Sequence, residues 1–272
     1  MTTAIYKYFF LGFLFLSQFI FAQKGLEALI ISDGVLLKCD NSKLPRDGSI
    51  ELPRTVNRIA KEVFKDCLPL KSISIAGTVT TIEEGAFSGC TNLTKVEILP
   101  NSVTYIGARA FANCAKLLII YLPNSVTNIG EEAFRGCSSL KKIEIPENVS
   151  ELGNRAFMDC SGLQQVNFLG EKLSVISSQL FYQCKQLQKA VLPESVKNIR
   201  SSAFAYCENL SSVTFPKQLE SIGDDAFEYC RRLISIDIPD SVVFVGASAF
   251  NSCSSLMKVK LPYGLRHILN DT

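Results

Sequence analysis

Nine cysteines recur along this chain at a nearly constant interval of about 23 residues. They are Cys67, Cys90, Cys114, Cys137, Cys160, Cys184, Cys207, Cys230 and Cys253. A fixed period of this length is typical of stacked supersecondary units, each of which packs only against its neighbours. The chain is therefore expected to fold as a solenoid, which offers a long surface for binding rather than one enclosed catalytic pocket.

The residues around each cysteine predict a short strand. Phe stands three residues before every one of the nine cysteines, and Leu stands three residues after it. Two apolar residues follow at alternate positions, as Ile143 and Ile145 do, and this alternation points their side chains inward. A proline such as Pro146 usually comes next and stops ladder pairing. Because every strand enters its repeat in the same direction, we expect the nine strands to form one parallel sheet.

The segment that leads to each cysteine is expected to form a short helical turn. In the stretch from Gly130 to Cys137, Ala and Phe would pack on the inner side of that turn. Acidic pairs such as Glu131–Glu132 and Asp224–Asp225 often open the segment, which suits the positive N-terminal end of a helix. The expected fold class is thus an α/β solenoid with a short parallel strand in each repeat and irregular or short helical outer segments.

The repeat LPNSVTNIGEEAFRGCSSLKKIEIP, residues 122–146, resembles the leucine-rich repeats of the BspA-like type, and every repeat from Ile59 to Ile268 fits. Residues 31–64 resemble the segment that opens such solenoids. The resemblance implies a curved, right-handed solenoid, with residues 23–58 as an N-terminal cap and residues 59–272 as about nine cysteine-phased repeats, the last incomplete. Relatives are mostly surface or secreted proteins, and several are adhesins. The resemblance supplies no catalytic residues.

Residues 1–22 predict a secretory signal peptide. Lys7 precedes an apolar run from Tyr8 to Phe21, and Ala22–Gln23 offers a small-residue cleavage site. The run is shorter than the ~20 residues that a membrane-spanning helix needs, although an uncleaved anchor is the alternative. Cleavage would lower the formal net charge from +2 to +1. A nearly neutral chain gives no reason to expect a nucleic acid or an anionic membrane as partner.

Ten cysteines in an exported chain raise the question of disulfides. In a stack of repeats, equivalent side chains point the same way, so neighbouring Cβ vectors run parallel and do not converge. Flanking Phe and Leu also suit small buried thiols. We therefore expect buried, reduced cysteines, with oxidation of an adjacent pair as the alternative. Cys39 is out of phase with the series that starts at Cys67, and it belongs to the cap.

Known catalytic arrangements find little support. The single histidine, His267, lies at a spacer position near the end of the chain, and no nucleotide-binding or zinc-protease motif occurs. The acidic pairs fall in separate repeats, which disfavours a metal site. Asn92, Asn148 and Asn209 match the N-glycosylation acceptor pattern, which applies only in a eukaryotic source. We expect neither a metal nor a cofactor, and no enzyme activity.

The outward residues of the strands are the candidate protein-binding site. They alternate with the inward residues and should line a concave face. The candidates are Lys95, Glu97, Ile119, Tyr121, Lys142, Glu144, Gln165, Asn167, Lys189 and Val191. An aromatic and apolar centre with a charged rim is the usual composition of a protein-binding hot spot.

The sequence therefore predicts an exported, non-enzymatic binding protein, an adhesin that recognises a host or cell-surface protein through its concave β face. The alternative is a self-assembling scaffold without a specific ligand, and the third hypothesis is a hydrolytic enzyme. The last repeat stops before its Ala-Phe turn, which leaves Leu265, Ile268 and Leu269 poorly covered. We expect this end to fray or to associate end to end with another molecule.

Overall fold

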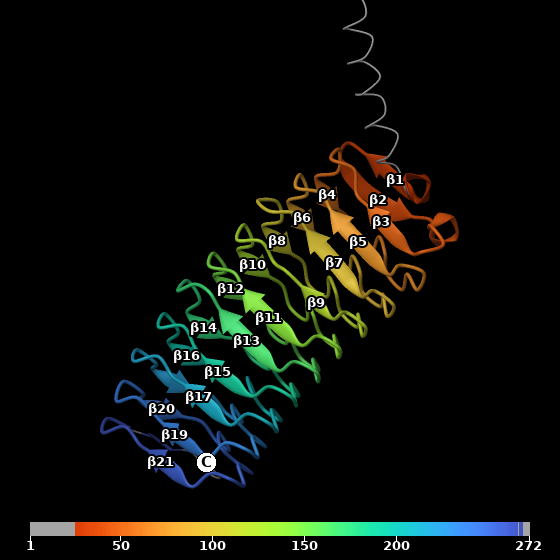
Figure 1. Cartoon of the computed structure of the whole chain (residues 1–272). Helices are drawn as coiled ribbons and strands as arrows, with labels where there is room; N and C mark the ends of the chain where they lie inside the picture. Colours follow the sequence, from red (N-terminus) through yellow and green to blue (C-terminus); the bar gives the residue numbers. More distant parts are fainter. Residues whose placement is uncertain (1–24, 266, 269–272) are drawn as a thin grey trace, which may run out of the picture.

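The computed structural model describes residues 25–265 and 267–268, which form a β-solenoid of about ten turns stacked along one axis (Figure 1). The first two strands of the described residues, β1 (Leu29–Ser32) and β2 (Val35–Cys39), form an antiparallel hairpin. Two 3-10 turns, η1 (Leu26–Ala28) and η2 (Asn41–Lys43), flank the hairpin. The predicted signal peptide lies outside the described residues.

One side of the solenoid carries the strands that the alternation of apolar residues predicts. In β11 the buried residues Ile143 and Ile145 alternate with partly exposed ones. We call this side the long-strand face, because its strands have three or four residues, apart from the two-residue β9. It consists of β3 (Ser49–Glu51), β5 (Ser72–Ile75), β7 (Lys95–Ile98), β9 (Ile119–Ile120), β11 (Lys142–Ile145), β13 (Gln165–Phe168), β15 (Lys189–Val191), β17 (Ser212–Thr214), β19 (Ser235–Asp237) and β21 (Lys258–Lys260).

A second column of two-residue strands runs beside the first (Figure 1). Each ends on an apolar residue, such as the buried Ile129 in β10. The column consists of β4 (Arg58–Ile59), β6 (Thr81–Ile82), β8 (Tyr105–Ile106), β10 (Asn128–Ile129), β12 (Glu151–Leu152), β14 (Val175–Ile176), β16 (Asn198–Ile199), β18 (Ser221–Ile222), β20 (Phe244–Val245) and β22 (His267–Ile268).

All strand pairs after the hairpin are parallel, and partners lie one repeat apart, as Ile143 and Val166 do. The expected single sheet is divided. The long strands form three sheets, in the orders β3-β5-β7-β9, β11-β13-β15-β17 and β19-β21. The short strands form two, β1-β2-β4-β6-β8-β10-β12 and β14-β16-β18-β20-β22. The hairpin thus extends the short-strand column through β2.

The expectation of an α/β fold with helical outer segments is wrong, because the outer segments are chains of tight turns in a β-solenoid. Some N–H groups of each turn bond to the next repeat. The N–H of Phe134 donates to the carbonyl of Ala156 at 2.8 Å, whereas the N–H of Cys137 donates to the carbonyl of Phe134 at 3.2 Å. An α-helix would need every N–H for a carbonyl four residues earlier in its own segment.

The reason lies in two left-handed residues in the outer turns. Glu132 has φ 55° and Gly136 has φ 71°, and the positions five and one residues before the other repeat cysteines behave alike. A left-handed residue interrupts an α-helix. The acidic pairs therefore do not open helices, and Glu132 itself occupies the first left-handed position.

The core is a file of aromatic rings and thiols along the axis. Eight of the nine repeat phenylalanines, from Phe64 to Phe227, are fully buried, and Phe250 is partly buried. Successive rings stack with centroids 5.0–5.6 Å apart, from Phe64 through to Phe250. We call this row the phenylalanine ladder. It joins each turn to both neighbours and confirms the predicted inward direction of these rings.

The cysteines also face inward, as predicted, and all ten are buried free thiols. From Cys90 to Cys253, each repeat thiol donates to the phenylalanine carbonyl of the preceding turn, as the Cys137 thiol does to the carbonyl of Phe111 at 3.2 Å. That carbonyl already accepts the N–H of Cys114, so the thiol occupies its second acceptor site. Burial raises the pKa of Cys160 to about 12 and that of Cys253 to about 11, which keeps both thiols neutral.

Candidate functional site on the long-strand face

The candidate residues predicted from sequence lie on or directly beside five neighbouring long strands, β7 to β15. Strand alternation places them in two rows across the strands. Lys95 pairs with Ile119 between β7 and β9, and Gln165 pairs with both Lys142 and Lys189 farther along. Neighbouring strands lie about 4.8 Å apart. The structure therefore brings side chains that are one whole repeat apart in the chain into adjacent positions.

Charged side chains of this face pair within their own strands. Lys95 Nζ lies 3.0 Å from Glu97 Oε2 on β7, and Lys142 Nζ lies 2.7 Å from Glu144 Oε1 on β11. The Lys142 ammonium lowers the pKa of the Glu144 carboxyl. On β13, the Gln165 amide donates to Asn167 Oδ1 at 3.2 Å. The Lys95–Glu97 pair is more than half exposed and the Lys142–Glu144 pair is partly exposed, so both add little to stability and remain accessible to a partner.

Between the two ion-paired strands lies an exposed apolar spot. Tyr121 follows β9 and is 67% exposed, and Ile119 in the same turn is 37% exposed. Val191, on β15, is 63% exposed. We call Ile119, Tyr121 and the flanking pairs Lys95–Glu97 and Lys142–Glu144 the central patch. Val191 is separate from it, since β11 and β13 lie between.

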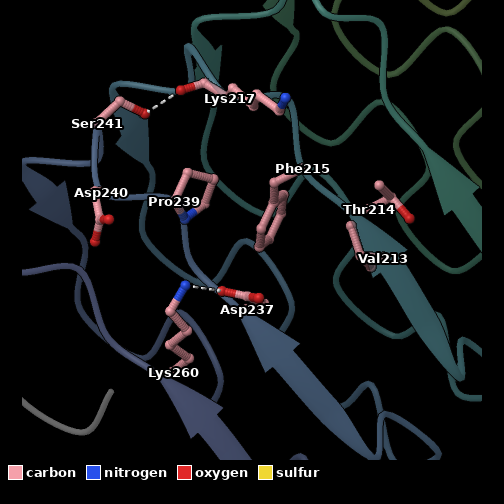
Figure 2. Close-up of a pocket in the computed structure, with 9 residues that line it drawn as sticks. All are labelled: Val213, Thr214, Phe215, Lys217, Asp237, Pro239, Asp240, Ser241 and Lys260. Carbon is pink, nitrogen blue, oxygen red and sulfur yellow. Dashed lines mark hydrogen bonds and ion pairs between the residues drawn. The ribbon is translucent and has the colours of Figure 1, made fainter.

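Sequence reasoning missed a hollow of about 580 Å³ at the far end of the same side (Figure 2). Its lining includes Phe215 and Pro239, which face each other, and the ion pair of Lys260 Nζ with Asp237 Oδ1 at 3.2 Å. Ser241 closes the opposite end by donating to the carbonyl of Lys217 at 2.8 Å.

Two features of the chain accompany this hollow. The strands β17 and β19, which approach it, belong to different sheets. Phe215 also replaces the Ile or Leu that most repeats carry at that inward position, and its ring meets the ladder ring of Phe227 at 68°. The larger ring fits by turning its edge to the ladder. The exchange to Phe215 is visible in the sequence but is shared by Phe168, so it does not single out this position, and the sheet division has no counterpart in the sequence.

The outer turns carry a separate electrostatic cluster that is not part of the long-strand face. The Glu132 side chain is only 7% exposed and lies 2.8 Å from Arg109 Nε, 3.4 Å from Arg135 and 3.8 Å from Arg155. Burial opposes ionisation of Glu132, but Arg109 and Arg135 outweigh it and hold the pKa of the carboxyl below its usual value. Arginine contacts between turns thus account for the acidic pair Glu131–Glu132, since Arg155 also lies 3.6 Å from Glu131.

The acidic pair Asp224–Asp225 lies in a different environment, without the arginine contacts given for Glu132. Burial raises the pKa of Asp225, and the negative charge of Asp224 raises it further. Asp224 Oδ1 accepts the N–H of Ala247 in the next turn at 2.9 Å. Within residues 25–265 and 267–268, no group of three His, Cys, Asp or Glu side chains is placed to hold a metal ion.

Comparison with known proteins agrees with this architecture. The family profile described as "BspA type Leucine rich repeat region" matches six copies over residues 3–117, 57–188 and 174–272. The chain belongs to the BspA-type leucine-rich repeat family. Proteins of this family are typically found at the cell surface or secreted, and leucine-rich repeat proteins generally act as non-enzymatic scaffolds for protein interactions. A comparison with curated proteins finds no match.

Solved structures show the same fold. A leucine-rich repeat protein from Eubacterium ventriosum is 27% identical over 80% of this BspA-type chain and 67% of its own, with a TM-score of 0.61. A leucine-rich repeat protein from Bacteroides ovatus is 24% identical over 86% and 84% of the two chains, with a TM-score of 0.51. Among the described residues, no helix has the length and apolar character to cross a bilayer.

Proposed function

We propose that this protein is an exported, non-enzymatic binding protein that recognises a protein on a host or cell surface through the central patch. Exposure of Tyr121 is the observation that carries the proposal. An aromatic side chain that is two-thirds exposed on a strand face, with exposed ion pairs on both sides, resembles the anchor and rim of a protein interface.

Export is the first condition of this proposal. It rests on the charged, apolar and small-residue order of residues 1–22, and on the surface or secreted location typical of the family. Expression of the full chain with its own leader, followed by N-terminal sequencing, tests it. The expected mature protein begins at Gln23, and a chain that keeps Met1 inside the cell contradicts export.

Ligand recognition is tested by direct binding to a panel of purified extracellular-matrix and cell-surface proteins. Tyr121→Ser should weaken binding of the cognate protein at least about 10-fold, as loss of an interface anchor does. Tyr105→Ser is the matched control, because Tyr105 is also an exposed tyrosine but lies on β8, in the short-strand column. Equal binding by the two variants would exclude the central patch.

A second variant tests the charged rim without removing its ion pair. Exchange of Lys142 and Glu144, as Lys142→Glu with Glu144→Lys, keeps an attractive pair on β11 but reverses the charge at each place. The exchange should leave the unfolding midpoint unchanged and slow association with the ligand, because rim charges mainly steer encounter. A variant that binds at the same rate at low ionic strength would remove the rim from the proposal.

The alternative is a scaffold that assembles with copies of itself. It is favoured by the exposed side chains of Met257, Val259, Leu261 and Tyr263, which lie in the last described turns. Concentration-dependent light scattering separates the two functions. Growth of large particles that Tyr121→Ser leaves unchanged and that Met257→Ser abolishes would support the scaffold and displace the central patch as the functional surface.

A further inference from the structure

The hollow beside Phe215 lies at a break between two long strands. β17 and β19 belong to different sheets, although each pairs with its other neighbour. Val213, the inward residue of β17, lines the hollow and is partly exposed. The equivalent residues Ala190 of β15 and Ile236 of β19 are buried. The break thus gives solvent access to an apolar side chain whose counterparts are covered.

The break also leaves a backbone donor without the bond that equivalent donors make. The N–H of Leu192 donates to the carbonyl of Thr214 in the next turn at 3.1 Å. The N–H of Ile238 donates to the carbonyl of Lys260 at 3.0 Å. Phe215 has the same position in its repeat, but in the described part of the chain its N–H reaches no backbone carbonyl. Because buried backbone donors are nearly always paired, this N–H offers a place for an acceptor atom of a ligand.

The two lysines that line the hollow differ in their partners. Lys260 Nζ is held by Asp237 at 3.2 Å. The Lys217 side chain is exposed, and its ammonium forms no ion pair with any residue in 25–265 or 267–268. Lys217 is therefore the cation of the hollow that can take an added anion.

The arrangement of the lining separates this cation from the remaining carboxylate. Figure 2 shows Lys217 along one edge of the hollow, with Phe215 and Pro239 next to it and Asp240 on another side. Asp240 Oδ1 accepts the N–H of Tyr263 in the next turn at 3.3 Å. The hollow thus presents apolar side chains beside two donors, the Lys217 ammonium and the Phe215 N–H, which come from one short segment of chain.

We propose that the hollow binds the C-terminal residue of a partner polypeptide, and that this residue has an apolar side chain. The side chain covers Val213 and packs against Phe215 and Pro239. The α-carboxylate accepts from Lys217 Nζ and from the Phe215 N–H. A chain-terminal residue carries both groups on one Cα atom, and capture of a terminal carboxylate by backbone donors and a cation is a recurring mode of peptide recognition.

This site is distinct from the central patch and does not depend on it. Tyr121 and its flanking ion pairs do not line the hollow. Failure of the test below therefore leaves the function proposed for Tyr121 untouched, and failure of the Tyr121 experiment leaves this site untouched.

Nuclear magnetic resonance titration of the isotope-labelled full chain tests the site. The probe is N-acetyl-L-leucine, which has an apolar side chain and a free α-carboxylate like a chain end. We expect saturable shifts of the backbone amides of Val213, Phe215 and Lys217, and unchanged amides in β7 and β9. N-acetyl-L-leucinamide lacks the carboxylate and N-acetylglycine lacks the side chain, so each should bind at least about 5-fold more weakly.

A charge variant assigns the carboxylate contact. Lys217→Gln should weaken binding of N-acetyl-L-leucine at least about 5-fold and leave binding of N-acetyl-L-leucinamide unchanged. The change lies on an exposed side chain, so the fold is expected to tolerate it. Lys189→Gln is the matched control, because Lys189 is also an exposed lysine of the long-strand face but does not line the hollow.

Three results would overturn the proposal. The first is the absence of saturable shifts at the hollow with about 20 mM N-acetyl-L-leucine. The second is equal affinity for this probe and its amide, or equal loss in the Lys217 and Lys189 variants. The third is tighter binding of the amidated dipeptide N-acetyl-leucyl-aspartate, whose only carboxylate is on a side chain, since that would assign the hollow to an internal segment of a partner and not to a chain end.

Discussion

Removal of one ring from the middle of the phenylalanine ladder should destabilise the protein more than removal of the ring at its end. Phe134 is fully buried and stacks on Phe111 and Phe157, each at 5.3 Å. Phe250 is partly buried and stacks on Phe227 at 5.4 Å. The two substitutions Phe134→Ala and Phe250→Ala remove the same atoms, so a difference between them measures the surroundings.

The magnitudes follow from burial and stacking. Phe134→Ala should cost about 3–5 kcal/mol, the usual range for a buried phenylalanine that leaves a cavity. Phe250→Ala should cost about 1.5–2.5 kcal/mol, because the ring is partly solvated already and loses one stacking partner. Phe134→Leu keeps most of the apolar volume and removes only the stacking, and should cost about 1–2 kcal/mol.

Urea unfolding followed by far-ultraviolet circular dichroism measures these costs. A break in the middle of a solenoid can also separate it into independently melting halves. We therefore expect Phe134→Ala to broaden the transition, and Phe250→Ala to shift it without broadening. Equal costs for the two alanine variants, within about 0.5 kcal/mol, would refute the argument that the ladder couples each turn to both neighbours.

Four further predictions concern the outer turns and the thiols. Glu132→Gln should lower the unfolding midpoint at pH 7 and have a smaller effect at pH 3. The folded-state pKa of Glu132 is depressed, so the stability that the ionised carboxylate adds is present above the unfolded-state pKa. This stability is lost as pH falls through the folded-state pKa. Asp225→Asn should raise the midpoint at pH 7 and leave it unchanged at pH 3, because a raised carboxyl pKa makes the ionised form a burden to the fold; calorimetry of both variants across this range checks the opposite signs. Ser202→Gly should stabilise by about 0.5 kcal/mol in urea unfolding, since glycine relieves the left-handed strain at φ 56° but adds entropy to the unfolded chain. Cys137→Ala should destabilise by about 1–3 kcal/mol, because it leaves a small void and a phenylalanine carbonyl with one donor fewer; an unchanged urea midpoint would contradict the proposed role of the thiol.

The inward half of the fold could be predicted from sequence, because packing restricts residue type there. A ring, a thiol and a leucine recur at fixed positions, and the structure buries all three in the central turns, as it does Phe134, Cys137 and Leu140. Alternation also identified the outward rows of the long strands. These inferences need only side-chain direction and period, and both follow from strand geometry.

The outer turns could not be predicted, because their decisive feature is a backbone angle that varied side chains share. The first left-handed position holds Glu132 in one turn and Ser202 in another, and the second holds Gly136 or Tyr229. Glycine would have revealed these positions, but it occupies few of them. The recurring glycine at Gly130 has another cause: a Cβ there would lie 2.6 Å from the backbone nitrogen of Ala108 in the preceding turn.

The candidate site was predictable only in part. The sequence supplied the outward residues, but the ion pairs within β7 and β11 and the hollow beside Phe215 needed coordinates. The pairing of β1 with β2 was likewise hidden, because the hairpin lies outside the repeats. Pairing across the hairpin depends on the path of a single non-repeating segment, and periodicity carries no information about such a segment.

Because the strands pair in parallel, each strand residue lies beside the equivalent residue of the next repeat. Insertion or removal of one whole repeat would leave every inward position matched to an equivalent one and would slide the outward pattern by a single row. Unequal recombination between repeats would thus change the outward face of the long strands while the interior stayed chemically the same.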